Sequence, residues 1–173
     1  VRSGAFANDI PDDPERCYYR LYTFSTMNRF IAAFSEMMRE YGSLTEFVRQ
    51  SVNDAKCISA VEAITSWFAA RGIEGVIPKN IQSSCKRVCM FMRWMVRSDS
   101  PVDLGLWSDI IDRRTLIMPM DTHVVQQSMR LNLLASSSTS MSAAQRLTSA
   151  MSLVFPDDPL KGDFALFGYG VNN

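Results

Sequence analysis

The sequence has a single histidine, four cysteines and no apolar run of the roughly eighteen residues that a membrane-spanning helix needs, so no such helix is expected. The cysteines, at positions 17, 57, 85 and 89, lack the spacing of a disulfide framework, which predicts reduced thiols in an intracellular protein. With one histidine and no second cysteine pair, neither a zinc nor an iron–sulfur site is expected. Cys85 and Cys89 are instead predicted to be small apolar residues on one helix. The first 17 residues lack the apolar stretch of a signal peptide.

The sequence also lacks an excess charge of either sign, because 18 basic residues balance 18 acidic ones. This balance argues against a histone-like polyanion binder, so any affinity for nucleic acid has to come from a local patch. Apolar residues make up 47% and charged residues 21%, which excludes a disordered or collagen-like chain. The length of 173 residues suits one compact domain. We therefore predict a single cytoplasmic domain, 1–173, with an irregular N-terminal segment over 1–20 and the core over 21–173.

The apolar residues recur at helical spacing along most of the chain, which predicts an all-α fold. Ser25 or Thr26 is the expected cap of the first long helix and Gly42 its end. Ser43 is expected to cap the next helix. The serine-rich segment 135–144 is either a flexible loop or a helix start with several possible caps. The remaining expected helices cover residues 55–70, 85–97, 122–134, 145–154 and a short buried helix or turn at 164–171.

Basic residues gather between Gly75 and Ser98, where five Lys or Arg residues occur without an acidic one. On the apolar helix 85–97, the pattern places Arg87, Arg93 and Arg97 outward. A window of one sign suggests a phosphate-binding surface, and a solvated helix face is the alternative. Ser83 and Ser84 precede this helix and can present amides and hydroxyls to a phosphate. Trp94 and Trp107 are expected in the core, with stacking on a base as the alternative.

Asp121 closes an extended apolar run and precedes a helical pattern, so it is expected to cap that helix. Taken alone, this pattern favours a structural role for the aspartate. The single histidine, His123, is likewise expected to be a hydrogen-bonded structural residue rather than a base.

The segment MDTHVVQQSMRLNLL resembles the V-D-T-H-V-x-R segment of the helix–hairpin–helix base-excision DNA glycosylases. The run RLYTFSTMNRFIAAFSEMMREYGSL is similar to the helix before the hairpin in that superfamily, and FPDDPLKGDFALFGYGV resembles its final core helix. More closely, CKRVCMFMRWMVR, VDLGLW, PMDTHV and DPLKGDFALFGYGV together resemble a bacterial family of hypothetical proteins placed in or near that superfamily. This closer resemblance covers nearly the whole chain.

The resemblance implies a helix–hairpin–helix DNA glycosylase-like bundle in a bacterial, nucleoid-associated monomer. Part of the N-terminal lobe is expected to be missing from this bundle, because the opening helices of the superfamily have no evident counterpart before Val1. Its implied partner is double-stranded DNA with a damaged or abasic nucleotide, and it implies no cofactor. Asp121 matches the essential aspartate of the superfamily, and Lys86 is the candidate for the nucleophilic lysine. The implied DNA contacts come from Ser83, Ser84, Arg87, Arg93 and His123.

Lys86 and Asp121 are 35 positions apart, so they can share one site only if the loop SDSPVDLGLWSD folds out of the way. The hairpin positions Asn80–Lys86 contain none of the glycines that let backbone amides approach a phosphate. Two alternatives stay open at this point. One is a catalytically inactive DNA-binding module of the same fold, and the other is a structural or interaction protein.

Overall fold

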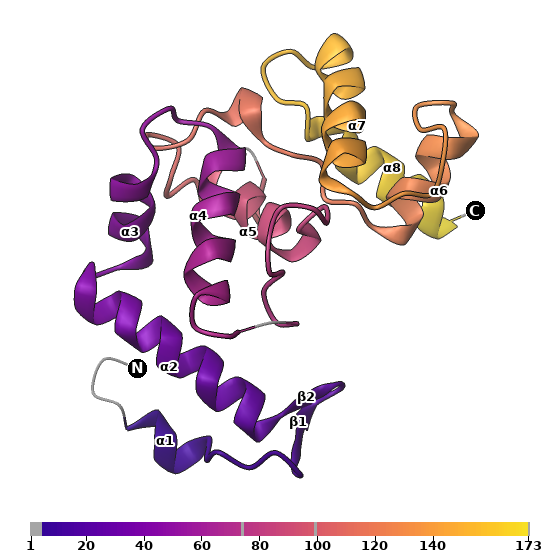
Figure 1. Cartoon of the computed structure of the whole chain (residues 1–173). Helices are drawn as coiled ribbons and strands as arrows, with labels where there is room; N and C mark the ends of the chain where they lie inside the picture. Colours follow the sequence, from indigo (N-terminus) through magenta and orange to yellow (C-terminus); the bar gives the residue numbers. More distant parts are fainter. Residues whose placement is uncertain (1–4, 74, 99, 173) are drawn as a thin grey trace.

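The structure is a computed structural model that describes residues 5–73, 75–98 and 100–172. It is largely helical, which confirms the all-α fold class in its broad form (Figure 1). The elements in chain order are α1 (Phe6–Asp9), β1 (Cys17–Tyr19), β2 (Tyr22–Thr23), α2 (Phe24–Glu40), α3 (Leu44–Ser51), α4 (Cys57–Ala69), α5 (Lys86–Val96), the 3-10 helix η1 (Arg113–Thr115), α6 (Thr122–Arg130), α7 (Met141–Val154) and α8 (Lys161–Asn172).

Side-chain caps begin most of the long helices. Ser43 accepts the Glu46 amide at the start of α3, and Asp121 accepts the His123 amide at the start of α6, both as the sequence predicts. At α2 the prediction of Ser25 or Thr26 was wrong, because the cap is Thr23, whose hydroxyl accepts an amide three residues on.

The segment 1–20 was predicted to be irregular, but its described part contains α1 and the first strand of a small antiparallel hairpin. Residues 1–4 lie outside the described residues. Cys17 pairs with Thr23 and Tyr19 with Tyr22, with a register shift between the two pairs. The hairpin escaped prediction because its strands are only three and two residues long, too short for an alternating pattern.

The chain folds into two groups of helices with α5 between them (Figure 1). On one side, α2, α3 and α4 pack around Trp67, which meets the rings of Tyr41 and Phe47 edge-on. On the other side lie α6, α7 and α8. Trp107 lies in the loop after α5 and is fully buried, as predicted. The centroid of its ring lies 5.5 Å from that of the Phe91 ring. Because α5 touches both groups, the residues at its ends lie where distant parts of the sequence meet.

Helix α5 differs from the prediction in which residues it buries. Arg93 and Arg97 were expected to face outward, but they are only 2% and 5% exposed because buried aspartates pair with both. Trp94 was expected in the core, yet 41% of its surface is exposed. Val88, Met92 and Met95 are buried, so the apolar stripe still faces the core, and the two paired arginines are buried beside it.

The C-terminal helices also differ from their expected bounds. Helix α6 ends at Arg130, four residues before the predicted end, and Asn132 has a left-handed backbone with a φ of 57°. Ser140 caps α7 and accepts the Ala143 amide, so the serine-rich segment ends in a helix start. Helix α8 begins at Lys161, three residues before the predicted short buried helix or turn, and it leaves several aromatic side chains exposed.

Candidate functional site

Lys86 and Asp121 come together although 35 positions separate them. The Lys86 Nζ lies 2.6 Å from the Asp121 Oδ2, which makes a direct ion pair. Lys86 is the first residue of α5, and Asp121 is the N-cap of α6, so two helix starts fix the positions of the two groups. The second oxygen, Oδ1, accepts the His123 backbone N–H at 2.9 Å. The capping bond orients the carboxylate so that its other oxygen is available to the amine.

The pair is accessible at the amine and more enclosed at the carboxylate. The Lys86 side chain is 46% exposed and the Asp121 side chain is 20% exposed. Burial raises the pKa of the Asp121 carboxyl, but the hydrogen bonds from Lys86 and from the His123 amide outweigh it, so its pKa lies below the ordinary value. The carboxylate is therefore ionised at neutral pH.

Asp121 also lines a cavity of about 550 Å³. Its walls come from α5, α8, the N-cap of α6 and the loop after α5, and they include aromatic side chains. Met90, Arg93, Trp94, Val102, Asp163, Phe164 and Phe167 complete the lining. The exposed face of Trp94 is thereby explained, since it forms a wall of this cavity rather than part of the core. The arrangement puts a carboxylate beside aromatic side chains in one cavity.

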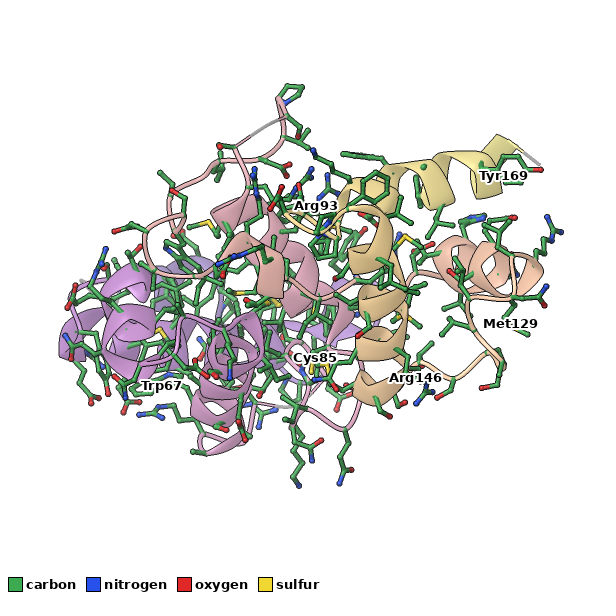
Figure 2. The ribbon with its side chains drawn as sticks, turned by 90° about the horizontal axis from the view of Figure 1, so that it is seen from above. Trp67, Cys85, Arg93, Met129, Arg146 and Tyr169 are labelled. Carbon is green, nitrogen blue, oxygen red and sulfur yellow. The ribbon has the colours of Figure 1, made fainter. Side chains whose placement is uncertain are left out.

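A buried charge network holds the wall of the cavity behind Trp94. The Arg93 Nη1 donates to the Asp163 Oδ2 at 2.9 Å. Arg97 bridges two further acids, donating to the Asp158 Oδ2 at 2.9 Å and to the Asp103 Oδ2 at 2.8 Å. All five side chains are at most 6% exposed. This network ties α5 to the start of α8, and Figure 2 shows Arg93 where these two helices meet.

Arg93 and Asp163, which belong to the buried network, also line the cavity together with Asp121. The Arg93 guanidinium stacks on the Phe164 ring, with 4.0 Å between its central carbon and the ring centroid. Burial raises the pKa of the Asp163 carboxyl, although the positive charges of Arg93 and Arg97 oppose the shift. The cavity thus contains one carboxyl with a raised pKa and one, that of Asp121, with a lowered pKa. Neighbouring carboxyls with opposite shifts are typical of functional sites.

The turn into α5 is strained at one residue. Cys85, the N-cap, has a φ of 47°, in the left-handed region that glycine adopts more readily. The segment before it pairs with the start of α7: the Ser84 N–H donates to the Thr139 carbonyl at 2.8 Å, and the Met141 N–H donates to the Gln82 carbonyl at 3.1 Å. Ser84, one of the predicted phosphate contacts, is 5% exposed, and its amide is bound to the Thr139 carbonyl.

The other predicted DNA contacts fare differently. Arg93 is buried in the charge network and also lines the cavity. Arg87 is exposed, and its guanidinium donates to the Gly75 carbonyl at 2.8 Å, which ties it to the segment between α4 and α5. Ser83 is exposed beside the start of α5. His123 is half-buried, and its ring meets the Phe167 ring edge-on at the side of the cavity.

Comparison with known proteins adds a family and no function. The family described as a protein of unknown function, DUF2400, matches residues 5–172. The chain belongs to this family. No curated protein and no solved structure matches the chain. The expected resemblance to a family of hypothetical proteins over nearly the whole chain is thus confirmed in that broad form, and the relation of the family to DNA glycosylases remains a proposal.

Three cavity residues on α8 were not identified from the sequence. Phe164 and Phe167 lie in the stretch 164–171 that was expected to be buried, whereas both are substantially exposed at the cavity, and Asp163 directly precedes that stretch. The signal that marks them is an aspartate followed by aromatic residues at helical spacing directly after a proline-rich break.

Two further findings concern the described residues 5–73, 75–98 and 100–172. They contain no group of three or more His, Cys, Asp or Glu side chains placed to hold a metal ion. None of the helices within these ranges is both long and apolar enough to cross a membrane.

Proposed function

We propose that this protein is a base-excision DNA glycosylase and abasic-site lyase, with Lys86 as the nucleophile and Asp121 as its electrostatic partner. The observation that carries the proposal is the 2.6 Å contact between the Lys86 Nζ and the Asp121 Oδ2, at the edge of a cavity of about 550 Å³. Ligand sites in proteins range from about 300 to 1,000 Å³. An enzyme that acts on a base needs such a space, because the nucleotide has to leave the duplex before its sugar can react.

The aromatic lining supports the choice of a nucleobase as the ligand. Trp94, Phe164 and Phe167 line the cavity together, and each of them is exposed by 41% or more. Exposed rings are available to stack on a flat base, and such stacking stabilises base binding by about 1–3 kcal/mol per base. Asp121 at the wall then lies near the sugar of a base that enters the cavity.

The proposed reaction begins with the unprotonated amine of Lys86. Its lone pair attacks the sugar carbon C1′, the new N–C1′ bond forms, and the bond from C1′ to the base breaks. The base leaves with the bonding electrons and takes up a proton. The amine then loses a proton, the bond from C1′ to the ring oxygen breaks and that oxygen takes up a proton, which yields an imine. Removal of a proton from C2′ expels the 3′ phosphate and cleaves the strand. On an existing abasic site, the same imine forms from the aldehyde with release of water.

Asp121 has two roles in this reaction. Its carboxylate faces the Lys86 ammonium directly, so it is placed to take the proton that the amine has to lose before it can attack. Because the pKa of Asp121 is low, the carboxylate passes this proton on to water and is ionised again. The negative charge then stabilises the positive charge that develops on the sugar as the base departs.

Borohydride trapping tests the proposal. The wild-type chain, an abasic-site duplex and sodium borohydride are expected to give a covalent protein–DNA adduct, because borohydride reduces the imine to a stable amine. Lys86→Ala is expected to give none. The matched control is Lys79→Ala, which removes another exposed lysine before the same helix and is expected to keep the adduct. Asp121→Asn is expected to slow adduct formation by about 10²-fold or more.

The same experiment separates the proposal from its main alternative. An adduct that persists in Lys86→Ala contradicts the role of this lysine. Salt-sensitive binding of the duplex by the wild type without any adduct supports an inactive DNA-binding module instead.

A further inference from the structure

A second cavity, of about 470 Å³, lies where α2, α4 and α5 meet. We call it the apolar cavity. Trp94 lines both this cavity and the one that Asp121 lines, and it is the only residue that the two linings share. The volume lies within the range of about 300–1,000 Å³ that ligand sites in proteins have. Neither Lys86 nor Asp121 lines the apolar cavity, so it is separate from the proposed reaction.

The walls of the apolar cavity are almost entirely aliphatic and aromatic. Ile64, Phe68 and Val88 belong to the buried core and are at most 4% exposed, and half-buried phenylalanines of α2 and α5 surround them. Among the described residues, no side chain of the lining can accept a hydrogen bond, and only those of Arg87 and Trp94 can donate one. A sugar or an amine would therefore lose bonds to water without replacement, whereas a hydrocarbon body loses none.

Arg87 is the one charged residue among the described residues that line the apolar cavity. Its Nη1 donates to the carbonyls of Gly75 and Val76 at 2.8 and 3.2 Å, so two backbone oxygens fix the guanidinium. The Tyr22 hydroxyl donates to the same Gly75 carbonyl at 3.0 Å, and the guanidinium carbon lies 5.7 Å from the centre of the Tyr22 ring. Segments far apart in the sequence thus hold the positive charge in place at the cavity.

One edge of the Arg87 guanidinium stays unused. Within the described part of the chain, nothing accepts a hydrogen bond from its Nε or Nη2, and no carboxylate lies within ion-pair distance of it. Two parallel N–H groups on such an edge match the two oxygens of a carboxylate. A phosphate monoester carries about two negative charges at neutral pH, and the described lining supplies a single cation. The charge therefore fits a monocarboxylate.

From the apolar walls and the unused edge of Arg87 we infer that the apolar cavity binds a free aliphatic monocarboxylate of the fatty-acid class. The hydrocarbon chain lies against the phenylalanines of α2 and α5, and the carboxylate accepts hydrogen bonds from the Nε and Nη2 of Arg87. Burial of the chain supplies most of the affinity, since each buried methylene raises it about fourfold. The inference goes beyond the proposed function and does not rest on it.

Calorimetric titration with decanoic acid and with 1-decanol, each below the concentration at which it aggregates, tests the role of the charge. The wild type is expected to bind the acid about tenfold more tightly than the alcohol. Arg87→Ala is expected to weaken binding of the acid by about 10- to 100-fold and to change binding of the alcohol little. The matched control is Arg29→Ala, which removes an exposed arginine of α2 outside the lining and is expected to keep the wild-type affinity for the acid.

Trp94 reports where the acid binds. A bromine-substituted decanoic acid quenches an indole that it touches, and the other two tryptophans, Trp67 and Trp107, are 9% and 0% exposed. The brominated acid is expected to quench the wild type, and Trp94→Phe is expected to lose the quenching while calorimetry still shows binding. Quenching of Trp94 that survives Arg87→Ala places the acid in the Asp121 cavity instead, and it overturns the inference.

The wild-type comparison decides the inference even if Arg87→Ala does not fold. Equal affinities of the wild type for the acid and the alcohol overturn it, and so does a wild type that binds neither probe. Binding of the acid without quenching of Trp94 places the ligand elsewhere and also overturns it. A preference for the acid that is lost in Arg87→Ala and kept in Arg29→Ala, with equal thermal midpoints of the two variants, supports it. The borohydride adduct at Lys86 is measured separately, so the fatty-acid site and the proposed function fail or stand independently.

Discussion

Replacement of Arg97 by alanine is expected to destabilise the protein severely. The side chain is 6% exposed and joins two carboxylates whose side chains are 0% exposed, those of Asp103 and Asp158. Without the guanidinium, the Asp158 carboxylate keeps only the Leu160 backbone N–H at 3.2 Å as a hydrogen-bond donor within the described structure. Removal of one partner from a buried ion pair costs about 3–5 kcal/mol, because the remaining charge is left uncompensated. We expect this loss in the free energy of unfolding.

Urea titration followed by circular dichroism measures the effect, and a thermal scan gives a second reading. For a chain of this size, about 3–5 kcal/mol corresponds to a decrease of about 6–20 °C in the melting temperature. The control is Arg49→Ala, which breaks an ion pair with Asp109 whose partners are 47% and 63% exposed. Such exposed pairs contribute about 0–1 kcal/mol. Equal losses in the two variants would refute the buried network as a source of stability.

Three further predictions concern packing, ionisation and capping. Gly170→Ala is expected to lower stability to urea by about 1–3 kcal/mol, since the added Cβ would lie 2.9 Å from the His123 Cβ between α6 and α8, whereas Gly168→Ala meets nothing within 4 Å and should not destabilise. Burial raises the pKa of the Cys57 thiol to about 12, so stability should fall as pH rises above about 9, where the unfolded thiol ionises and the folded one does not; a flat pH profile there would contradict this burial. Asp121→Ala should lower the free energy of unfolding by about 1 kcal/mol through the lost cap, and Asp121→Asn should lower it less, because an amide oxygen still caps the helix. The stability that the Asp121 charge itself contributes is present above about pH 4 and disappears as pH falls through the lowered pKa of the folded state.

Local signals predicted the helices and their caps well where one residue decides the outcome. Ser43 and Asp121 are caps because a short polar side chain satisfies free amides at the start of a helix, and that requirement is visible in the sequence itself. At α2, three candidate hydroxyls lie within four residues, and the register of the hairpin selects Thr23. The sequence of the helix itself does not indicate which hydroxyl is the cap, because the selection depends on the chain before the helix.

Burial of charge could not be predicted from local pattern. Arg93 and Arg97 are polar residues on an amphipathic helix, and such residues are ordinarily placed in water. Their partners lie far along the chain: Asp163 is 70 positions from Arg93, and Asp158 is 61 from Arg97. Only the fold brings these acids to the helix, and pairing with them buries the two arginines. Trp94, whose size and apolarity alone predicted burial, lies instead at the wall of the cavity that Asp121 lines.

The candidate site was predictable only in part. Asp121 was identified as a cap from its own surroundings, but its convergence with Lys86 was expected from the resemblance to a superfamily rather than from spacing. The contact requires that α5 and α6 begin side by side, which depends on the packing of the whole C-terminal half. The positions of Phe164 and Phe167 at the cavity depend on the same packing. The local sequence does not contain this information, and their apolar character alone predicted burial in the core.

Peptide mapping of the borohydride-reduced protein–DNA adduct tests the central claim most directly. After nuclease and protease digestion, mass spectrometry locates the residue that carries the reduced sugar remnant. The account predicts a single modified peptide with the remnant on the Nζ of Lys86. A remnant on any other amine, or wild-type protein recovered without modification from an abasic-site duplex, would contradict it.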